Sequence, residues 1–196
     1  RGETLFLCGG NGSGKSTLLM LLCGLLTPGS GIIRVDGDAV DERGAAPYRN
    51  RFAAVFFDFT LFRHVIDADA GAASPAAVAS WLQRMQLHEK VGYHEGCLTS
   101  LDLSQGQRKR LALLQACLDD RDILVLDEIT ADQDSEFREH FYVRILPELK
   151  RRGKTVILVT HDDRYWHHAD RLVVLDCGRA FERPVPLAAA AACGVQ

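Results

Sequence analysis

The stretch that decides the fold is Gly9-Gly10-Asn11-Gly12-Ser13-Gly14-Lys15-Ser16-Thr17, near the start of the chain. Its portion Gly9–Ser16 matches the pattern G-x-x-x-x-G-K-[ST] in full. The apolar segment Thr4–Cys8 before it is predicted to be a strand, and Lys15–Leu26 is predicted to be a helix ended by a Thr-Pro-Gly turn. Because glycines let backbone N–H groups turn inward around an anion, this strand, loop and helix predict a phosphate-binding site.

The residues of this loop contribute different chemistry. The Lys15 ammonium is expected to neutralise the β- and γ-phosphates of a nucleotide and so to assist catalysis, while the Ser16 hydroxyl is expected to ligate Mg²⁺. The helix N-terminus adds partial positive charge. We therefore predict ATP and Mg²⁺ as the cofactors. The residues predicted to bind ATP are Gly9, Gly10, Asn11, Gly12, Ser13, Gly14, Lys15, Ser16 and Thr17.

The composition is that of an ordinary globular domain and excludes several classes of protein. The chain has 196 residues, 47% of them hydrophobic and 25% charged, which suffices for one α/β domain with a sizeable core. The net charge of −3 provides no basic surface for nucleic acid. No stretch reaches the roughly 20 apolar residues of a membrane span. The six cysteines form no CxxC pair, so we expect free, mostly buried thiols and no zinc site.

Predicted strands and helices alternate, which indicates an α/β fold with a mainly parallel sheet flanked by helices. The later predicted strands are Gly31–Val35, Ala53–Phe57, Ile123–Leu126, Thr155–Thr160, Arg171–Leu175 and Arg179–Phe181. The later predicted helices are Ala76–Met85, Ser104 to about Cys117, Asp134–Leu149 and Asp163–His168. We expect one ATP-binding domain, 1–196, that contains a small helical subdomain at about 61–102. Ser74 and Pro75 are a typical helix start within that segment.

Polar residues follow two of the predicted strands. Asp127 and Glu128 end the apolar strand Ile123–Leu126, and both are expected to emerge at its carboxyl end, where ligands bind in open α/β sheets. Asp127 is suited to hold Mg²⁺ through water, and Glu128 to orient and deprotonate the attacking water. His161 follows the strand Thr155–Thr160 in the same manner, and we expect it to contact the γ-phosphate. The predicted catalytic residues are Glu128, His161 and Lys15.

A further motif, Leu103-Ser104-Gln105-Gly106-Gln107, precedes Asp127 and resembles the LSGGQ signature of ATP-binding cassettes. A serine-capped helix N-terminus beside a small residue offers donors to an anion, as the phosphate loop does. With these motifs in order, the whole chain resembles the ATPase domain of the ATP-binding-cassette (ABC) transporters. The resemblance implies a phosphate-loop NTPase fold and a sandwich of two domains. In that sandwich Ser104, Gly106 and Gln107 bind the ATP held by a second copy.

A narrower resemblance concerns Leu103–Leu113, Asp127–Tyr142 and Thr160–Asp163. These segments are similar to the cyclic-peptide exporter group, which includes pyoverdine-type siderophore-precursor exporters and microcin exporters. Members of that group commonly have glutamine, here Gln105, in place of the signature glycine. They also commonly have the sequence of Ala131–Asp134 in place of the usual SALD of the D-loop. Its members carry a membrane domain before the ATPase, and we interpret the abrupt start of this sequence as that of a fragment. The resemblance implies ATP-driven export at the cytoplasmic face of the inner membrane, with a membrane domain on the same chain.

The sequence departs from the family pattern at three places. The glutamine of the Q-loop is expected near Phe57 and is absent, and we hypothesise that Asp58 contacts the metal or its water instead. Ile129 stands where the exporter group commonly has tryptophan. The aromatic residue that stacks on adenine precedes the first strand in the family and lies outside this sequence. After the Phe57-Asp58 loop, Phe59–Val65 is expected to contact the membrane domain.

Two other interpretations remain open. The basic run Arg108–Arg110 could indicate nucleic acid, but we favour a solvated helix face or an interface within the transporter, with no nucleic acid as partner. The alternative function is a soluble, non-transport ABC ATPase of nucleic-acid repair or translation. A pseudo-ATPase that only binds nucleotide is disfavoured because all the expected catalytic residues are present. Six or so membrane helices encoded upstream would support export.

Overall fold

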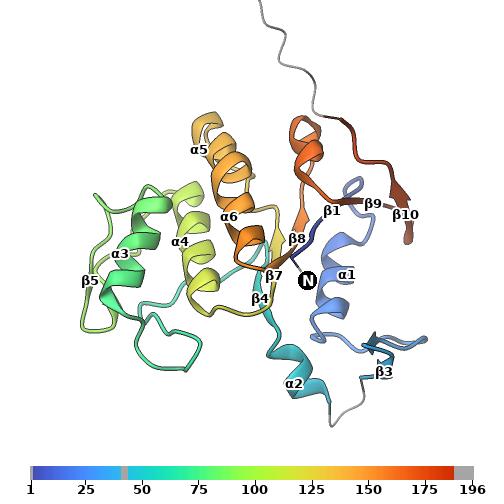
Figure 1. Ribbon diagram of the computed structural model, residues 1–196, viewed down its shortest axis with the longest axis horizontal. Helices are drawn as coiled ribbons and strands as arrows, with labels where there is room; N and C mark the ends of the chain where they lie inside the picture. The colour runs from blue at the N-terminus through green and yellow to red at the C-terminus, as the bar shows by residue number, and fades with distance from the viewer. Residues whose placement is uncertain (1, 41–43, 188–196) are drawn as a thin grey trace, which may run out of the picture.

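A six-stranded sheet forms the centre of the computed structural model, which describes residues 2–40 and 44–187 (Figure 1). The strand order is β10-β9-β1-β8-β7-β4, and every neighbouring pair is parallel except β9 and β10. The strands are β1 (Thr4–Cys8), β4 (Phe52–Val55), β7 (Ile123–Asp127), β8 (Thr155–Val159), β9 (Arg171–Asp176) and β10 (Arg179–Arg183). Each lies within two residues of its predicted bounds, so the predicted α/β fold is confirmed.

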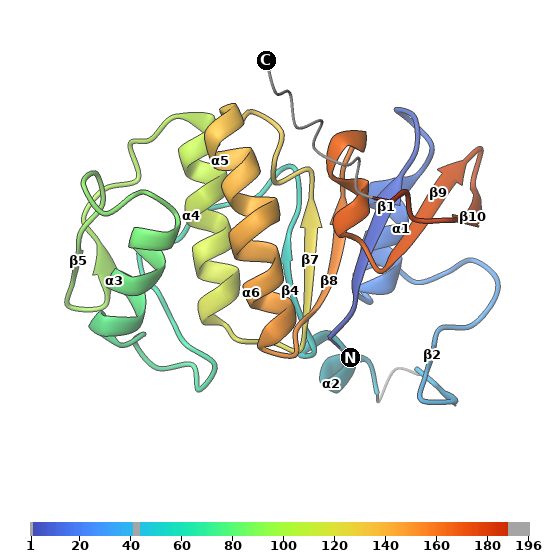
Figure 2. The same cartoon turned by 45° about the horizontal axis from the view of Figure 1, so that its top comes forward.

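Helices cover both faces of the sheet, with α1 on one side and α4, α5 and α6 on the other (Figure 2). The helices are α1 (Lys15–Leu22), α2 (Ala45–Arg49), α3 (Pro75–Arg84), α4 (Gln105–Leu118), α5 (Ser135–His140) and α6 (Leu146–Arg151). Successive side chains of a strand point to opposite faces. Accordingly, Leu7 packs with Leu19 in the core under α1, whereas Phe6 and Leu158 belong to the larger core under α4, α5 and α6.

The first helix is about one turn shorter than the predicted Lys15–Leu26, because it ends at Leu22. Gly24 follows with a φ of 68°, a left-handed conformation that glycine adopts without strain. Its N–H donates to the Leu21 carbonyl at 3.0 Å, and the next N–H donates to the Met20 carbonyl at 2.9 Å. This pair of bonds is a Schellman motif, so a glycine cap ends the helix before the predicted Thr-Pro-Gly stop.

The predicted helix Asp134–Leu149 consists of three consecutive pieces: α5, the π-helical turn Phe141–Ile145, and α6. Its first residue is a cap rather than a helical residue, since the carboxylate of Asp134 accepts a hydrogen bond from the N–H of Phe137 at 2.7 Å. Pro147 follows the π-helical turn and has no N–H to donate. The ordinary α-helical ladder is therefore interrupted at this point.

Several short elements were missed by the sequence analysis. They are α2, β3 (Asp38–Ala39), β5 (Tyr93–His94) and β6 (Cys97–Leu98), whereas β2 (Arg34–Val35) is the end of the predicted strand Gly31–Val35. Two-residue strands carry too little periodicity to be recognised, and most of the predicted strand Gly31–Val35 is loop. Within 61–102, α3 begins as predicted, with the Ser74 hydroxyl accepting from the N–H of Ala77 at 3.2 Å, and it packs beside α4. The bounds of a helical subdomain remain a prediction.

The thiols of the described residues are free, as predicted. Cys8, Cys23 and Cys117 are buried, and burial raises the pKa of Cys8 and Cys23 to about 11. Cys177 is exposed in the two-residue turn between β9 and β10, where it and Gly178 both have positive φ, as such hairpins require. Cys193 lies outside the described residues. Within 2–40 and 44–187, no helix is long and apolar enough to cross a membrane.

Candidate active site

The phosphate loop joins the carboxyl end of β1 to α1 and borders a cavity of about 390 Å³. The cavity is lined by Asn11, Gly12, Gly14, Lys15, Ser16 and Thr17, together with Glu128 after β7. Gly9 has a φ of 148°, and a Cβ at this position would lie 2.2 Å from the carbonyl oxygen of Leu175 in β9. Only glycine therefore lets the loop start this close to the neighbouring strand.

Two polar side chains of the loop suit an anionic ligand. Lys15 is 7% exposed, and its Nζ donates to the carbonyls of Gly9 and Gly10 at 3.0 and 2.9 Å. The hydroxyl of Ser13 is buried and has no hydrogen-bond partner among the described residues. The ammonium of Lys15 lines the cavity and has three N–H donors, of which two are bonded to these carbonyls, so it suits a ligand that accepts a further hydrogen bond. The residues present therefore fit the phosphates of ATP.

Asp127, the last residue of β7, is brought next to Ser16, whose hydroxyl donates to its carboxylate at 2.9 Å. Asp127 lies at the carboxyl end of β7, as expected, and its side chain is buried against this hydroxyl. Burial raises the pKa of Asp127, and the bond from Ser16 opposes that shift.

The described residues contain no group of three or more His, Cys, Asp or Glu side chains that could hold a metal by themselves. Mg²⁺ is usually held by one or two protein ligands together with substrate phosphates and water. The adjacent oxygens of Ser16 and Asp127 fit that arrangement.

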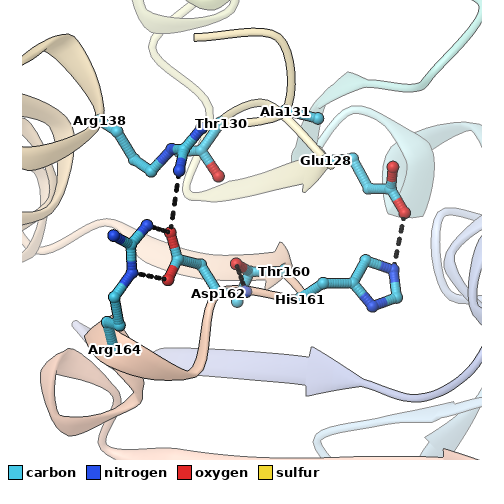
Figure 3. A pocket seen from close by; sticks show the side chains of 8 residues that line it. All are labelled: Glu128, Thr130, Ala131, Arg138, Thr160, His161, Asp162 and Arg164. Carbon is cyan, nitrogen blue, oxygen red and sulfur yellow. Dashed lines mark hydrogen bonds and ion pairs between the residues drawn. The ribbon is translucent and has the colours of Figure 1, made fainter. Parts of the chain in front are cut away.

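Glu128 and His161 meet at the carboxyl edge of the sheet, where Nε2 of His161 lies 2.9 Å from Oε1 of Glu128 (Figure 3). They come together because β7 and β8 are paired in register and each residue follows its strand. Glu128 has a φ of 53°, a left-handed conformation uncommon for a residue with a side chain. Both side chains are partly exposed, and Glu128 borders the phosphate-loop cavity.

Glu128 also borders a second cavity, of about 310 Å³, on the side of His161 (Figure 3). Its other lining residues are Thr130, Ala131, Arg138, Thr160, Asp162 and Arg164. Asp162 accepts from Arg164 at 2.7 and 2.8 Å and lies 3.5 Å from Arg138, and the bond from Arg164 lowers its pKa. No motif in the sequence predicted that these charged residues line a cavity. The one available signal was the position of Asp162, directly after His161 at a strand end.

The signature residues lie at the N-terminus of α4, and none of them lines either cavity. Ser104 caps the helix and forms a capping box with Gln107, in which each side chain bonds the other's backbone N–H. Gly106 is buried against the loop after β7, and a Cβ there would lie 2.5 Å from the carbonyl oxygen of Asp132. The structure does not bring these residues to the phosphate loop of the same chain.

The basic run that follows is not a solvated helix face. Lys109 is 1% exposed and Arg110 is 9% exposed. Arg110 donates to Gln133 at 2.8 Å and to Asp134 at 2.5 Å, and its guanidinium lies 3.7 Å from the ring centre of Phe137. The interpretation as a solvated face was wrong for Lys109 and Arg110, because acceptors from the loop after β7, distant in the sequence, cover this side of α4. An interface within the transporter remains a prediction.

Asp58 is exposed in the turn after β4 and lines neither cavity. Because β4 pairs in register with β7, this turn lies at the same edge of the sheet as Asp127. The role of Asp58 toward the metal remains a hypothesis.

Comparison with known proteins agrees with this geometry. Residues 1–131 match the family described as ABC transporter. The chain is 46% identical over 179 residues to the ATP-binding protein SyrD of Pseudomonas syringae pv. syringae, covering 90% of this chain and 32% of SyrD. It is 37% identical to an ATP-dependent lipid A-core flippase of Burkholderia pseudomallei (strain 1710b), covering 92% of this chain and 32% of the flippase. The chain thus spans about a third of the length of these relatives.

Two solved structures are also similar. One is the dimeric post-hydrolysis structure of the ATP-binding cassette MJ0796 bound to ADP and Pi, with a TM-score of 0.72 at 25% identity, covering 92% of this chain and 85% of that one. The other is a bacterial Atm1-family ABC exporter with ATP bound, with a TM-score of 0.75 at 25% identity, covering 91% and 32%. The chain therefore belongs to the ABC transporter family, as an ATPase domain of the phosphate-loop NTPase fold.

Proposed function

We propose that the chain binds MgATP and hydrolyses it as the motor domain of an exporter. The observation that carries the proposal is the convergence of five side chains at one edge of the sheet. They are Lys15 and Ser16 at the start of α1, Asp127 and Glu128 at the end of β7, and His161 after β8. Polar side chains that gather beside a cavity at the carboxyl ends of parallel strands are typical of an active site.

Each of these side chains takes a distinct part in the proposed reaction. Lys15 places positive charge beside the β- and γ-phosphates, and Ser16 with Asp127 holds Mg²⁺, which when bound neutralises the phosphate oxygens. Glu128 accepts the proton of the attacking water. His161, 2.9 Å from Glu128, is proposed to orient that carboxylate and to contact the γ-phosphate.

The complete site requires a second copy of the domain. Ser104, Gly106 and Gln107 offer the N-terminus of α4 to an anion, yet they line neither cavity of their own chain. We propose that they bind the phosphates held by the other copy. The dimeric form of the similar cassette MJ0796 supports this arrangement.

Export is proposed from the relatives and from an apolar surface. The Burkholderia relative is a flippase and one solved structure is an exporter. Phe62 and Ile66 are 66% and 52% exposed beside a cavity of about 320 Å³ whose other lining residues are His64, Val65 and Gln115.

We propose that Phe59–Val65 contacts a membrane domain of the full-length chain, at the cytoplasmic face of the inner membrane. We propose that the cargo is a cyclic peptide or siderophore precursor. A gene without about six upstream membrane helices would contradict export.

The decisive test of the chemistry is Glu128→Gln. It removes the base and keeps the shape, so ATP binding is expected to persist while hydrolysis slows by about two orders of magnitude or more. An ATP-bound dimer is then expected to accumulate in size-exclusion chromatography. The exposed Glu139→Gln in α5 is the matched control and is expected to behave as wild type. Hydrolysis by Glu128→Gln at the wild-type rate would reject the proposed role of Glu128 as the base.

The hypothesis for Asp58 has its own test. If its carboxylate contacts the metal or its water, Asp58→Ala is expected to raise the Mg²⁺ concentration needed for half-maximal hydrolysis. Unchanged rate and Mg²⁺ dependence would reject this role.

A further inference from the structure

Lys109 on α4 is a buried charge that the reaction described above does not use. Its side chain is 1% exposed. Nζ donates to the carbonyl of Glu128 at 3.1 Å, to the carbonyl of Ala131 at 3.3 Å and to the carboxylate of Asp132 at 3.0 Å. An ammonium has three N–H donors, and these three acceptors match them.

All three acceptors belong to one tight turn, Glu128–Asp132, which follows β7. Both ends of the turn, Glu128 and Asp132, are left-handed, with φ of 53° and 62°. Residues with side chains avoid this conformation, so the surrounding contacts must hold it in place. The N–H of Ala131 closes the turn on the carbonyl of Glu128 at 3.1 Å, and Lys109 binds that same carbonyl.

Lys109 also reaches the turn after β4, where its Nζ lies 5.8 Å from the ring centre of Phe57. That distance is within the range of a cation–π contact. The ammonium of Lys109 thus links α4, on which Lys109 lies, to the turn after β4 and to the turn that carries Glu128. A buried charge is costly unless its hydrogen-bond partners are well placed. The ammonium of Lys109 and the turn Glu128–Asp132 therefore constrain each other's position.

We propose that Lys109 is a positioning residue for hydrolysis. It fixes the strained backbone at Glu128 and so directs that carboxylate toward His161 and the water it activates. The proposal rests on the proposed role of Glu128 as base. Since Lys109 acts on the backbone of the turn and lines neither cavity, it is expected to affect the rate of hydrolysis and not the affinity for ATP.

The test compares Lys109→Met with Lys154→Met. Lys154 is a matched control because its side chain is also largely buried and bonds the carbonyl and carboxylate of Asp120, another left-handed residue, at 2.6 and 2.8 Å. Lys154 precedes β8 and lies at the opposite edge of the sheet from the cavities.

Lys109→Met is expected to lower kcat about tenfold or more with the Kd for ATP changed less than about threefold. Lys154→Met is expected to leave both values near wild type. Equal losses in the two variants, or a loss in Kd alone, would overturn the proposal.

The same substitution in the Glu128→Gln background separates this proposal from the proposed base. If Lys109 acts through Glu128, Lys109→Met is expected to slow the residual single-turnover rate of Glu128→Gln by less than about twofold. A full additional tenfold loss would show that Lys109 acts elsewhere and would reject the inference while leaving the base intact. A wild-type rate in Glu128→Gln alone would instead reject the proposed base.

Asp132→Asn keeps the proposal testable if Lys109→Met does not fold. Asp132 has a 54% exposed side chain, so this change removes the carboxylate without opening the core. It is expected to lower kcat about two- to fivefold at unchanged Kd, because one of the three acceptors of Lys109 weakens. An unchanged kcat in this variant would contradict the proposal.

Discussion

The phosphate loop, Gly9–Thr17, and the signature contact, in which Gly106, Lys109 and Arg110 of α4 meet Ala131–Asp134, are built on opposite principles. In the phosphate loop the hydroxyl of Ser13 has no partner among the described residues, and Lys15 bonds its own loop beside a cavity. In the signature contact the buried ammonium and guanidinium are bonded to acceptors of the same chain.

This difference predicts that the two regions affect different measured quantities. The phosphate loop is completed by a ligand, so its substitutions are expected to change affinity for ATP. The signature contact is completed by the chain itself, so its substitutions are expected to change stability and the rate of hydrolysis. The comparison is therefore tested by measuring affinity and rate separately for matched variants.

The largest effect is expected from Lys15→Met. Loss of a charge-assisted contact to phosphate is expected to weaken ATP binding by about 100-fold, or ~3 kcal/mol, as measured by titration calorimetry. Lys150 lies on α6, and Lys150→Met removes its partly exposed ion pair with Asp170, so this variant is the control and is expected to retain wild-type affinity. A Kd for Lys15→Met within about threefold of wild type would contradict the assignment of the loop.

Gly106→Ala is expected to give the next largest effect, on rate. A new Cβ would lie 2.5 Å from the carbonyl of Asp132, so the turn that carries Glu128 must shift. Hydrolysis is expected to fall about tenfold, although alanine favours a helix by ~1 kcal/mol over glycine. The Kd for ATP of the unpaired domain is expected to stay nearly unchanged, because Gly106 does not line its own phosphate-loop cavity. Gly29→Ala is the control, because a Cβ there meets no atom within 4 Å. A faster or equally active Gly106→Ala protein would show that the contact is not tight.

A smaller effect is expected from Ser104→Ala, compared with Ser74→Ala. Both serines cap helices by accepting an N–H bond, so each variant is expected to lose about 1 kcal/mol of unfolding free energy. Only Ser104→Ala is also expected to reduce hydrolysis, because α4 is the helix proposed to bind the phosphates held by a second copy. Denaturant unfolding and a rate measured against protein concentration check this pair. Equal activities would contradict the proposed sandwich.

The smallest effect concerns pH. The N–H of Phe137, and then Arg110, lower the pKa of Asp134 below its ordinary value of 3.8. A lowered pKa contributes stability that is complete above the unfolded value and is lost as the pH falls through the folded value. The difference in unfolding free energy between wild type and Asp134→Asn is therefore expected to shrink as the pH is lowered from about 6 to about 3. A difference that stays constant over this pH range would show that the ionised carboxylate of Asp134 does not stabilise α5.

The sequence by itself determined the phosphate loop, the alternation of strands and helices, and the acids after β7. These features are encoded by consecutive residues, whose glycines, caps and apolar runs act over a few positions. It also indicated the edge of the sheet at which Asp127, Glu128 and His161 meet, because parallel strands share a carboxyl edge.

Only the tertiary structure decided the environment of Lys109 and Arg110, the bond between Ser16 and Asp127, and the Asp162 pairs in the second cavity. Sequence periodicity shows which residue types recur on a helix, but not which distant loop covers a charged face. The left-handed turn at Glu128 was equally hidden, since nothing local favours it over an ordinary strand end. The Lys109 side chain of α4, distant in the sequence, bonds the carbonyl of Glu128, and we propose that this contact holds the backbone there.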